Sequence, residues 1–118
     1  MRSLGPVERE VMQVLWSAAA PLTGHEVLQA LGREDMAYTT LLTVLERLRA
    51  KEYLTRSREG RSYRFQTTSQ EADFVADQMS RALSGSANKS GALLRFADQL
   101  DPSEAAALRA ALDAMDAE

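Results

Sequence analysis

The chain has 118 residues, of which 45% are hydrophobic, and it carries a formal net charge of −3. This length fits one domain, or one small domain with an appended segment, and supplies enough apolar residues for a core. There is no cysteine and a single histidine, which excludes zinc-finger, iron–sulfur, thiol-redox and multi-histidine metal sites. No apolar run approaches the roughly 20 residues that a membrane span needs, and the start of the chain lacks the apolar segment of a signal peptide. We therefore expect a cytoplasmic protein with no metal and no cofactor.

The charge is distributed unevenly along the chain. Residues 1–65 carry ten Lys and Arg against eight Asp and Glu, whereas residues 66–118 carry four against nine. The most basic stretch is 47–64, where seven basic residues stand against two acidic ones, a net charge of +5. Such a local excess indicates an anion-binding surface in the first half of the chain, which the net charge conceals.

Three helices are predicted before residue 53. The first begins near Pro6, because proline is well tolerated at the first helical position, and it ends at residues 18–21. The second follows Thr23, which forms a capping box with the glutamate three residues later, and it ends at Gly32. The third runs from about 37 to 52. The apolar positions that recur at helical spacing, and that we expect to face the core, are Val7, Val11, Met12, Leu15, Trp16, Val27, Leu28, Leu31, Leu41, Val44, Leu45 and Leu48.

A β-hairpin is predicted next, with a two-residue turn at Glu59-Gly60. Its two strands are residues 54–58 and 61–65. This register sets Leu54 opposite Phe65 as an apolar pair over the core. It also sets Arg56 opposite Tyr63, where the arginine can lie along the aromatic ring.

The rest of the chain is predicted to be helical apart from one connection. A helix covers residues 69–84, and the small-residue stretch 84–91 is typical of a mobile connection. A short helix follows around residues 93–100, and Asp101-Pro102 starts the last helix.

Three helices followed by a hairpin have the outline of a winged helix-turn-helix, a mainly α fold with a small β-hairpin. The third helix supports this interpretation, because the side opposite its apolar stripe displays Thr39, Thr43 and Ala50, flanked by Thr40. Small threonine side chains let a helix approach the floor of the major groove, exchange hydrogen bonds with base edges and pack methyl groups against thymine. The N-terminus of the same helix favours phosphate. We predict that residues 1–68 form a winged-helix DNA-binding domain.

Each of these features also has a simpler explanation. Thr39 and Thr40 could serve only as a helix cap, and the basic residues could form an ordinary solvated surface. Trp16 is expected in the core, and His25 is assigned no role. Glu46 counts against an indiscriminate DNA-binding surface, although it could accept from a cytosine amino group or orient a neighbouring arginine. What favours DNA binding is the order of the elements, with a threonine-faced third helix followed by a basic hairpin.

Two other classes of function compete with DNA binding as explanations of this sequence. The alternative is a winged-helix protein-interaction module that binds a protein partner through the third helix, and the basic hairpin argues against it. An enzyme is disfavoured, because the chain has no cysteine, no Gly-rich phosphate loop and no G-x-S-x-G motif. No small-molecule substrate is evident.

The acidic segment 69–118 carries more apolar residues than a few short helices can bury alone. Pairing with a second copy would bury them, and two copies of the third helix related by a twofold axis would read an inverted repeat. We therefore predict that this segment is a helical dimerisation segment and that the protein is a homodimer. The predicted interface residues are Phe74, Met79, Leu83, Leu93, Leu94, Phe96, Leu100, Leu108, Leu112 and Met115.

Several segments match one known pattern. Residues 4–16 read LGPVEREVMQVLW, and residues 36–51 read MAYTTLLTVLERLRAK. The wing sequence GRSYRF at 60–65 and the tail segments 94–98 and 101–109 fit the same pattern. Together these motifs resemble the penicillinase-repressor family, that of the BlaI and MecI repressors, with the third helix matching its recognition helix.

The resemblance implies a homodimeric winged-helix repressor that occupies an inverted-repeat operator until an inducing signal releases it. It implies that the threonines contact bases, while Arg47 and the wing arginines contact phosphates. The candidate DNA-binding residues are Tyr38, Thr39, Thr40, Thr43, Arg47, Lys51, Arg58, Arg61 and Arg64.

The resemblance also implies a way to release the repressor. In the best-known members a membrane sensor-protease triggers cleavage at an Asn-Phe bond, and Arg95-Phe96 stands at that place here, so this pair is the candidate cleavage region. The small-residue stretch beside it leads us to expect proteolysis within residues 84–97. The chain lacks the C-terminal Cys-x-Cys pair of copper-responsive relatives.

Overall fold

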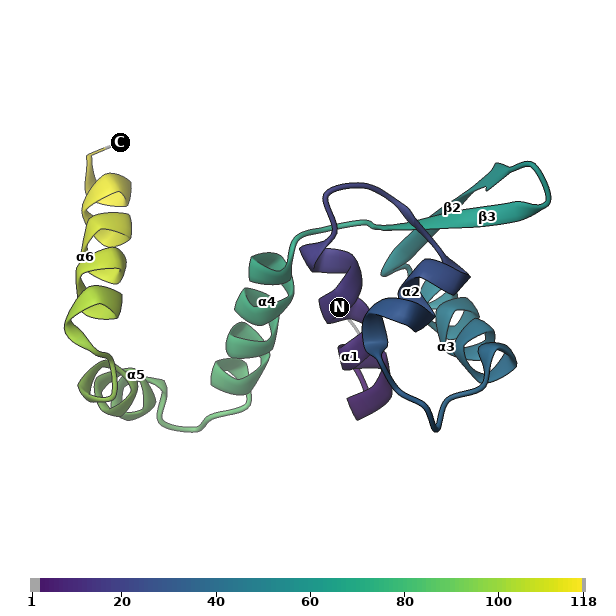
Figure 1. Cartoon of the computed structure of the whole chain (residues 1–118). Helices are drawn as coiled ribbons and strands as arrows, with labels where there is room; N and C mark the ends of the chain where they lie inside the picture. Colours follow the sequence, from purple (N-terminus) through teal and green to yellow (C-terminus); the bar gives the residue numbers. More distant parts are fainter. Residues whose placement is uncertain (1–2, 118) are drawn as a thin grey trace. The chain divides into compact units, whose positions relative to one another are not determined.

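The computed structural model describes residues 3–117, in which six helices and three short strands follow one another along the chain (Figure 1). The chain divides after Gln78 into two compact units. The elements are α1 (Pro6–Ser17), β1 (Leu22–Thr23), α2 (Gly24–Leu31), α3 (Tyr38–Ala50), β2 (Leu54–Glu59), β3 (Ser62–Thr67), α4 (Glu71–Ser84), α5 (Lys89–Asp98) and α6 (Pro102–Asp116). The predicted fold class, mainly α with a small antiparallel sheet, is confirmed.

Local signals determine where α1 and α2 begin and end. Pro6 is the first residue of α1, as predicted. The hydroxyl of Thr23 accepts the Glu26 backbone N–H, and the Glu26 carboxylate accepts the Thr23 backbone N–H, which forms the predicted capping box. Gly32 ends α2 in the left-handed conformation, with φ of 63°.

The end of α3 differs from the prediction, because the helix stops at Ala50 and not at 52. Glu52 adopts a left-handed conformation with φ of 69°. The backbone N–H of Tyr53 donates to the carbonyl of Leu48, and that of Glu52 donates to the carbonyl of Arg49. This is a Schellman motif with glutamate in the place that glycine usually takes, so the sequence carried no stop signal there.

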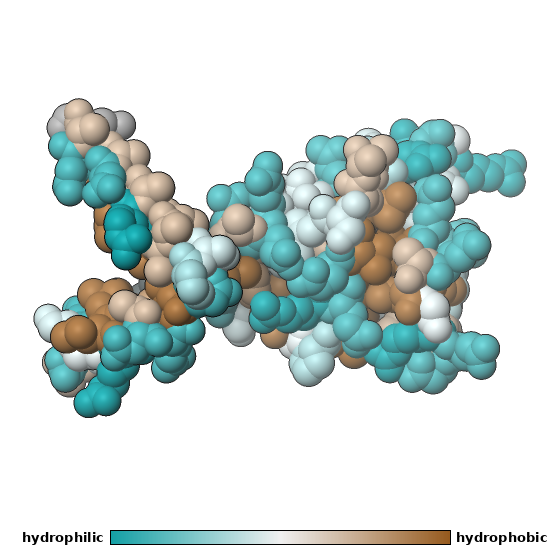
Figure 2. Space-filling view, turned by 60° about the vertical axis from the view of Figure 1, so that its left-hand side comes forward, coloured by the Kyte–Doolittle hydropathy of each residue, from teal (hydrophilic) through white to brown (hydrophobic). Residues whose placement is uncertain are grey.

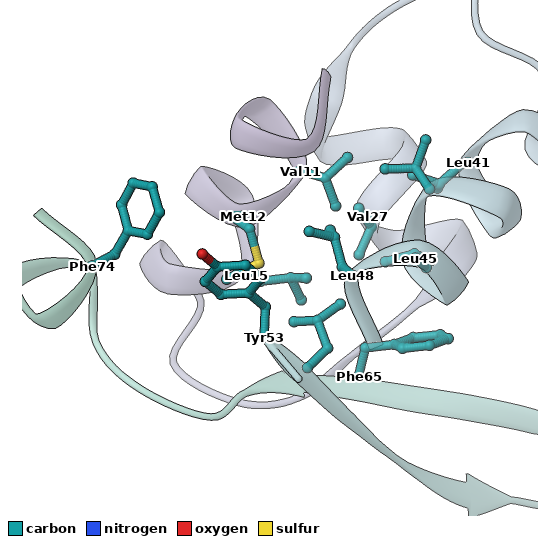
Figure 3. Close-up of a cluster of buried hydrophobic side chains, with 12 residues drawn as sticks. Val11, Met12, Leu15, Val27, Leu41, Leu45, Leu48, Tyr53, Phe65 and Phe74 are labelled. Atoms are coloured by element: carbon teal, nitrogen blue, oxygen red, sulfur yellow. The ribbon is translucent and has the colours of Figure 1, made fainter. Parts of the chain in front are cut away.

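One hydrophobic core holds the first unit together, and its side chains point toward one another from the helices and the sheet (Figure 3). Fully burying a leucine or phenylalanine contributes about 1.5–3 kcal/mol, so these positions dominate the stability of the unit. The buried members are Val11, Met12, Leu15, Val27, Leu41, Val44, Leu45, Leu48, Tyr53, Leu54, Phe65 and Phe74.

The sheet has the order β1-β3-β2 and is antiparallel throughout. The predicted hairpin register was wrong by two residues: Leu54 pairs with Thr67, and the turn is Gly60-Arg61. A tight hairpin turn requires a left-handed residue at its first position, and Gly60 meets this requirement with φ of 62°, whereas the predicted turn would have placed a glutamate there. Because the shift is even, every side chain keeps its predicted face. The short strand β1 was not predicted.

The beginning of α4 is attached to the first unit by aromatic contacts. Phe74 lies 5.6 Å from Trp16 and 5.9 Å from Tyr53 between ring centroids, and the indole N–H of Trp16 donates to the carbonyl of Ser69. Phe74 is 2% exposed, so its side chain packs inside this unit and has almost no surface to offer the predicted dimer interface. These contacts explain why the first compact unit extends to Gln78, beyond the 68/69 boundary that the sequence predicted.

The second unit is built differently, because none of residues 79–117 is buried. Figure 2 shows hydrophobic side chains gathered at the surface of the helices α5 and α6. Asn88 caps α5 and Asp101 caps α6, each accepting a backbone N–H three residues later. The predicted connection 84–91 was too long, since Lys89 already begins α5. Within residues 3–117, no helix is both long and apolar enough to span a membrane.

Candidate nucleic-acid interface

The helix α3 presents two different faces. Leu41, Val44, Leu45 and Leu48 are buried against α1 and α2 and the sheet, as predicted. The threonines on the other side, at 39, 40 and 43, are exposed. The helix is therefore held by its apolar stripe while a row of small polar side chains stays open, which is what readout of the major groove requires.

The hydroxyl of Thr43 is already engaged within the helix. It donates a hydrogen bond of 3.1 Å to the backbone carbonyl of Thr39. In this arrangement the oxygen offers lone pairs to a partner, so Thr43 can accept from the amino group of a cytosine or an adenine.

Tyr38, the first residue of α3, is tied to α2. Its ring stacks on the imidazole of His25, with 3.9 Å between the centroids and 4° between the planes. A Cβ atom at Gly24 would meet the Tyr38 Oη at 3.0 Å, so a side chain there would push the ring away. Gly24 thus lets α2 approach the first turn of α3, and Tyr38 orients the helix that carries the threonines.

Two grooves border the exposed face of α3. The first, of about 500 Å³, lies between α3, the start of α1 and the loop that precedes α3. The second, of about 470 Å³, lies between α3, the start of α2 and the hairpin. Thr40, Thr43 and Arg47 line the first. Arg56, Arg61 and the Tyr38 ring line the second. The exposed threonine face is thus a ridge between two grooves that hold basic side chains together with one acidic residue each, Asp35 in the first and Glu46 in the second. This shape suits a helix inserted between two phosphate backbones.

The hairpin β2–β3 projects from the helices as a wing (Figure 1). Arg56 lies over the ring of Tyr63, with its guanidinium carbon 4.1 Å from the centroid, so the predicted cation–π contact forms although the two residues are diagonal neighbours. Arg58 donates to the carbonyl of Gly60, and Arg61 occupies the turn itself. In the described part of the chain, no acidic side chain forms an ion pair with Arg47, Arg58 or Arg61.

Glu46 forms ion pairs with two of the basic residues beside the threonine face. Its carboxylate accepts from Arg49 at 3.0 Å and from Arg56, on the wing, at 2.7 Å. The hydrogen bonds from Arg49, together with the charges of both arginines, hold the pKa of Glu46 below its ordinary value. Glu46 therefore joins α3 to the wing, and its charge is compensated where a DNA phosphate would approach.

Lys51, a predicted DNA contact, forms an ion pair inside the first unit. Its ammonium lies 2.9 Å from the carboxylate of Glu8, which is 5% exposed, and it also donates to the carbonyl of Ser3. Burial alone would raise the pKa of Glu8, but the hydrogen bonds from Gly5 N–H and Lys51 outweigh it and lower the pKa. This pair fastens the end of α3 to the start of α1, a role that the sequence pattern did not reveal.

Arg64, another predicted contact, is surrounded by acceptors. It donates to the carboxylates of Glu26 and Glu59 and to the carbonyl of Pro21. Nothing in the local sequence indicated these partners, because two of the three lie about forty residues away.

Comparison with known proteins identifies the family to which this chain belongs. A sequence model of the family described as penicillinase repressor matches residues 4–114. The chain belongs to the penicillinase-repressor family. Members and relatives are transcriptional regulators and not enzymes, so the resemblance seen in the sequence motifs is confirmed.

Individual relatives agree with the family. The transcriptional regulator BlaI of Mycobacterium tuberculosis is 39% identical over 118 residues, which covers 97% of this chain and 86% of that one. The solution structure of monomeric Bacillus licheniformis BlaI in complex with the blaP half-operator matches with a TM-score of 0.50 and 29% identity, over 61% of this chain and 88% of that one. A transcriptional regulator from Thermotoga maritima, 18% identical, shares the fold over 96% of this chain and 74% of its own, with a TM-score of 0.54.

Proposed function

We propose that this penicillinase-repressor family member is a sequence-specific repressor that binds an inverted-repeat operator as a homodimer in the bacterial cytoplasm. The observation that carries the proposal is the exposed threonine face of α3, which stands beside a wing whose Arg58 and Arg61 have no acidic partner among residues 3–117. The half-operator complex of the B. licheniformis relative supports it.

Base reading and backbone binding are divided between two sets of side chains. Thr39, Thr40 and Thr43 supply the contacts to base edges, which determine the sequence that is recognised. Arg47, Arg58 and Arg61 supply the contacts to phosphates, which provide most of the affinity and its dependence on salt.

The second unit supplies the homodimer contact. Large apolar side chains cover its helices without being buried, including Leu94 at 67% and Met115 at 69% exposed. Exposed patches of this kind on a small helical unit are typical of interaction surfaces, and a second copy brings a matching one. Pairing also places two copies of α3 on one operator, so each adds its few base pairs to the recognised sequence.

Release follows from separating the two units. Arg95 and Phe96 lie within α5, and the connection 85–88 precedes it. Cleavage within residues 84–97, by a membrane sensor-protease or an enzyme that it activates, would detach much of the apolar surface from the DNA-binding unit. Two half-sites would then be bound independently and weakly.

A gel-shift titration tests the proposal. The full-length protein should form a discrete complex with DNA from upstream of its own gene, and the complex should weaken steeply as salt rises. Scrambled DNA of the same length is the control. Binding of a protein partner without any discrete, salt-sensitive DNA complex would instead favour a winged-helix protein-interaction module.

A further inference from the structure

The guanidinium of Arg64 connects three segments of the first unit. Nη1 lies 3.0 Å from the Glu26 carboxylate and 3.2 Å from the Pro21 carbonyl, and Nε donates to the Glu59 carboxylate near the end of β2. The side chain is 34% exposed, and its Nε and Nη1 groups donate to protein acceptors. The wing and the start of α2 are therefore joined through one side chain.

Backbone pairing brings the same segments together. Arg64 pairs with Thr23 in the ladder between β1 and β3. Thr23 is also the N-cap of α2, and the Glu26 oxygen that accepts from Arg64 is the one that accepts from the Thr23 backbone N–H at 2.8 Å. The cap of α2, the first helix of the helix-turn-helix, is thus bonded directly to the wing strand.

We propose that Arg64 is a positioning residue that holds the wing at a set orientation to the helix-turn-helix, and that it does not bind phosphate itself. The inference rests on the proposed function, DNA binding through α3 and the wing. Arg61, three residues before it, lies in the turn and has no acidic partner within residues 3–117, so it is the residue that the held wing presents to the DNA.

The geometry requires an arginine. The three acceptors belong to different segments, and the planar fork of a guanidinium reaches them with separate N–H groups held in one plane. A lysine ammonium is a compact point charge, which serves well against a phosphate but cannot reproduce that fork. Replacement by lysine therefore separates the two roles, since it retains phosphate binding and loses positioning.

The decisive experiment measures operator affinity for four full-length variants by fluorescence anisotropy. Arg64→Lys should weaken operator binding about as much as Arg64→Ala, by about tenfold, because both lose the charge-assisted fork. At Arg61, a proposed phosphate contact, the lysine and alanine variants should differ: Arg61→Lys should bind the operator more tightly than Arg61→Ala, since a lysine ammonium can replace a phosphate contact. Arg64→Lys binding as tightly as the wild type would overturn the proposal.

Glu26→Gln is the second test, because its effect has opposite signs under the two roles. Glutamine preserves the capping box but removes the ion pair with Arg64. Positioning predicts weaker operator binding, and it predicts that adding Arg64→Ala to Glu26→Gln costs less affinity than Arg64→Ala costs in the wild type. If Arg64 binds phosphate, removing its acidic competitor should strengthen operator binding, which would contradict the proposal.

Hydrogen exchange tests the same role without DNA. The amides of β2 and β3 near the turn should exchange faster in Arg64→Lys and Glu26→Gln than in the wild type, whereas Arg61→Ala should leave them unchanged. Unchanged exchange in both of the first two variants would refute positioning even if the wild type bound no operator. Failure of the wild type to bind DNA would refute the proposed function alone.

Discussion

The two compact units differ in where their apolar side chains lie. In the first unit, residues from α1, α2, α3, the sheet and α4 enclose one core, with Leu41 and Leu48 fully buried. In the second unit the apolar side chains are as large but remain at the surface, as Leu94 and Leu112 do. The first unit can therefore fold on its own contacts. The second unit needs a partner that buries its apolar side chains to gain the same free energy from burial.

A cavity in the core of the first unit should change stability the most. Leu48→Ala should lower the free energy of unfolding by about 2–5 kcal/mol, because the cavity adds to the lost burial. Urea unfolding followed by Trp16 fluorescence measures it. Leu94→Ala should leave the urea midpoint of this transition unchanged. Equal decreases in the free energy of unfolding at both positions would show that the two units do not differ in this way.

A charge on the second unit should break the dimer and spare the first unit. Leu112→Asp places a carboxylate on the apolar stripe of α6, and we expect the dissociation constant of the dimer to rise by at least about tenfold. Sedimentation velocity across a dilution series measures it. Ala110→Asp, on the opposite side of the helix, is the control and should stay dimeric. A wild-type protein that is monomeric at all concentrations would refute the proposal that a second copy buries the apolar side chains of the second unit.

Acid should destabilise the first unit through Glu8. Its pKa is lowered in the folded state, so the Glu8–Lys51 pair contributes stability above the ordinary pKa of glutamate, and this contribution is lost as pH falls through the lowered value. Glu8→Gln should cost about 1.5–3 kcal/mol at pH 7, from the lost hydrogen bonds to charged groups. Thermal unfolding at several pH values measures the difference, which should shrink below about pH 4.5. A difference that grows in acid would contradict the ion pair.

A substitution on the threonine face of α3 should change only the choice of DNA sequence, by a modest amount, and should leave both units folded. Thr43→Ala should cost on the order of 1 kcal/mol of discrimination between the operator and a mutated operator, with unchanged stability and dimerisation. Arg61→Ala is the contrasting variant, since it should weaken binding to both DNAs and reduce the slope of affinity against salt by about 0.9 per phosphate lost. Equal losses on both DNAs for Thr43→Ala would assign it no part in reading bases.

The sequence predicted best what depends on neighbouring residues. The caps at Thr23 and Asp101 and the buried stripe of α3 lie where their local patterns placed them. Prediction failed where a residue distant in the chain, or an unusual backbone conformation, determines where a helix ends or where a side chain packs. Glu52 ends α3 in a conformation that favours glycine, and Phe74 has the spacing of an interface residue but packs on Trp16.

The candidate site divides in the same way. Local sequence patterns predict that a threonine-faced helix is followed by a basic hairpin, since helical periodicity and turn residues act within a few positions. Which basic side chains remain available for DNA depends on how the chain folds. Lys51 and Arg64 look like Arg47 and Arg61 in a charge count, yet the first two meet carboxylates from α1, α2 and β2. Ion pairing depends on distances between groups far apart in the chain, and the fold alone sets those distances.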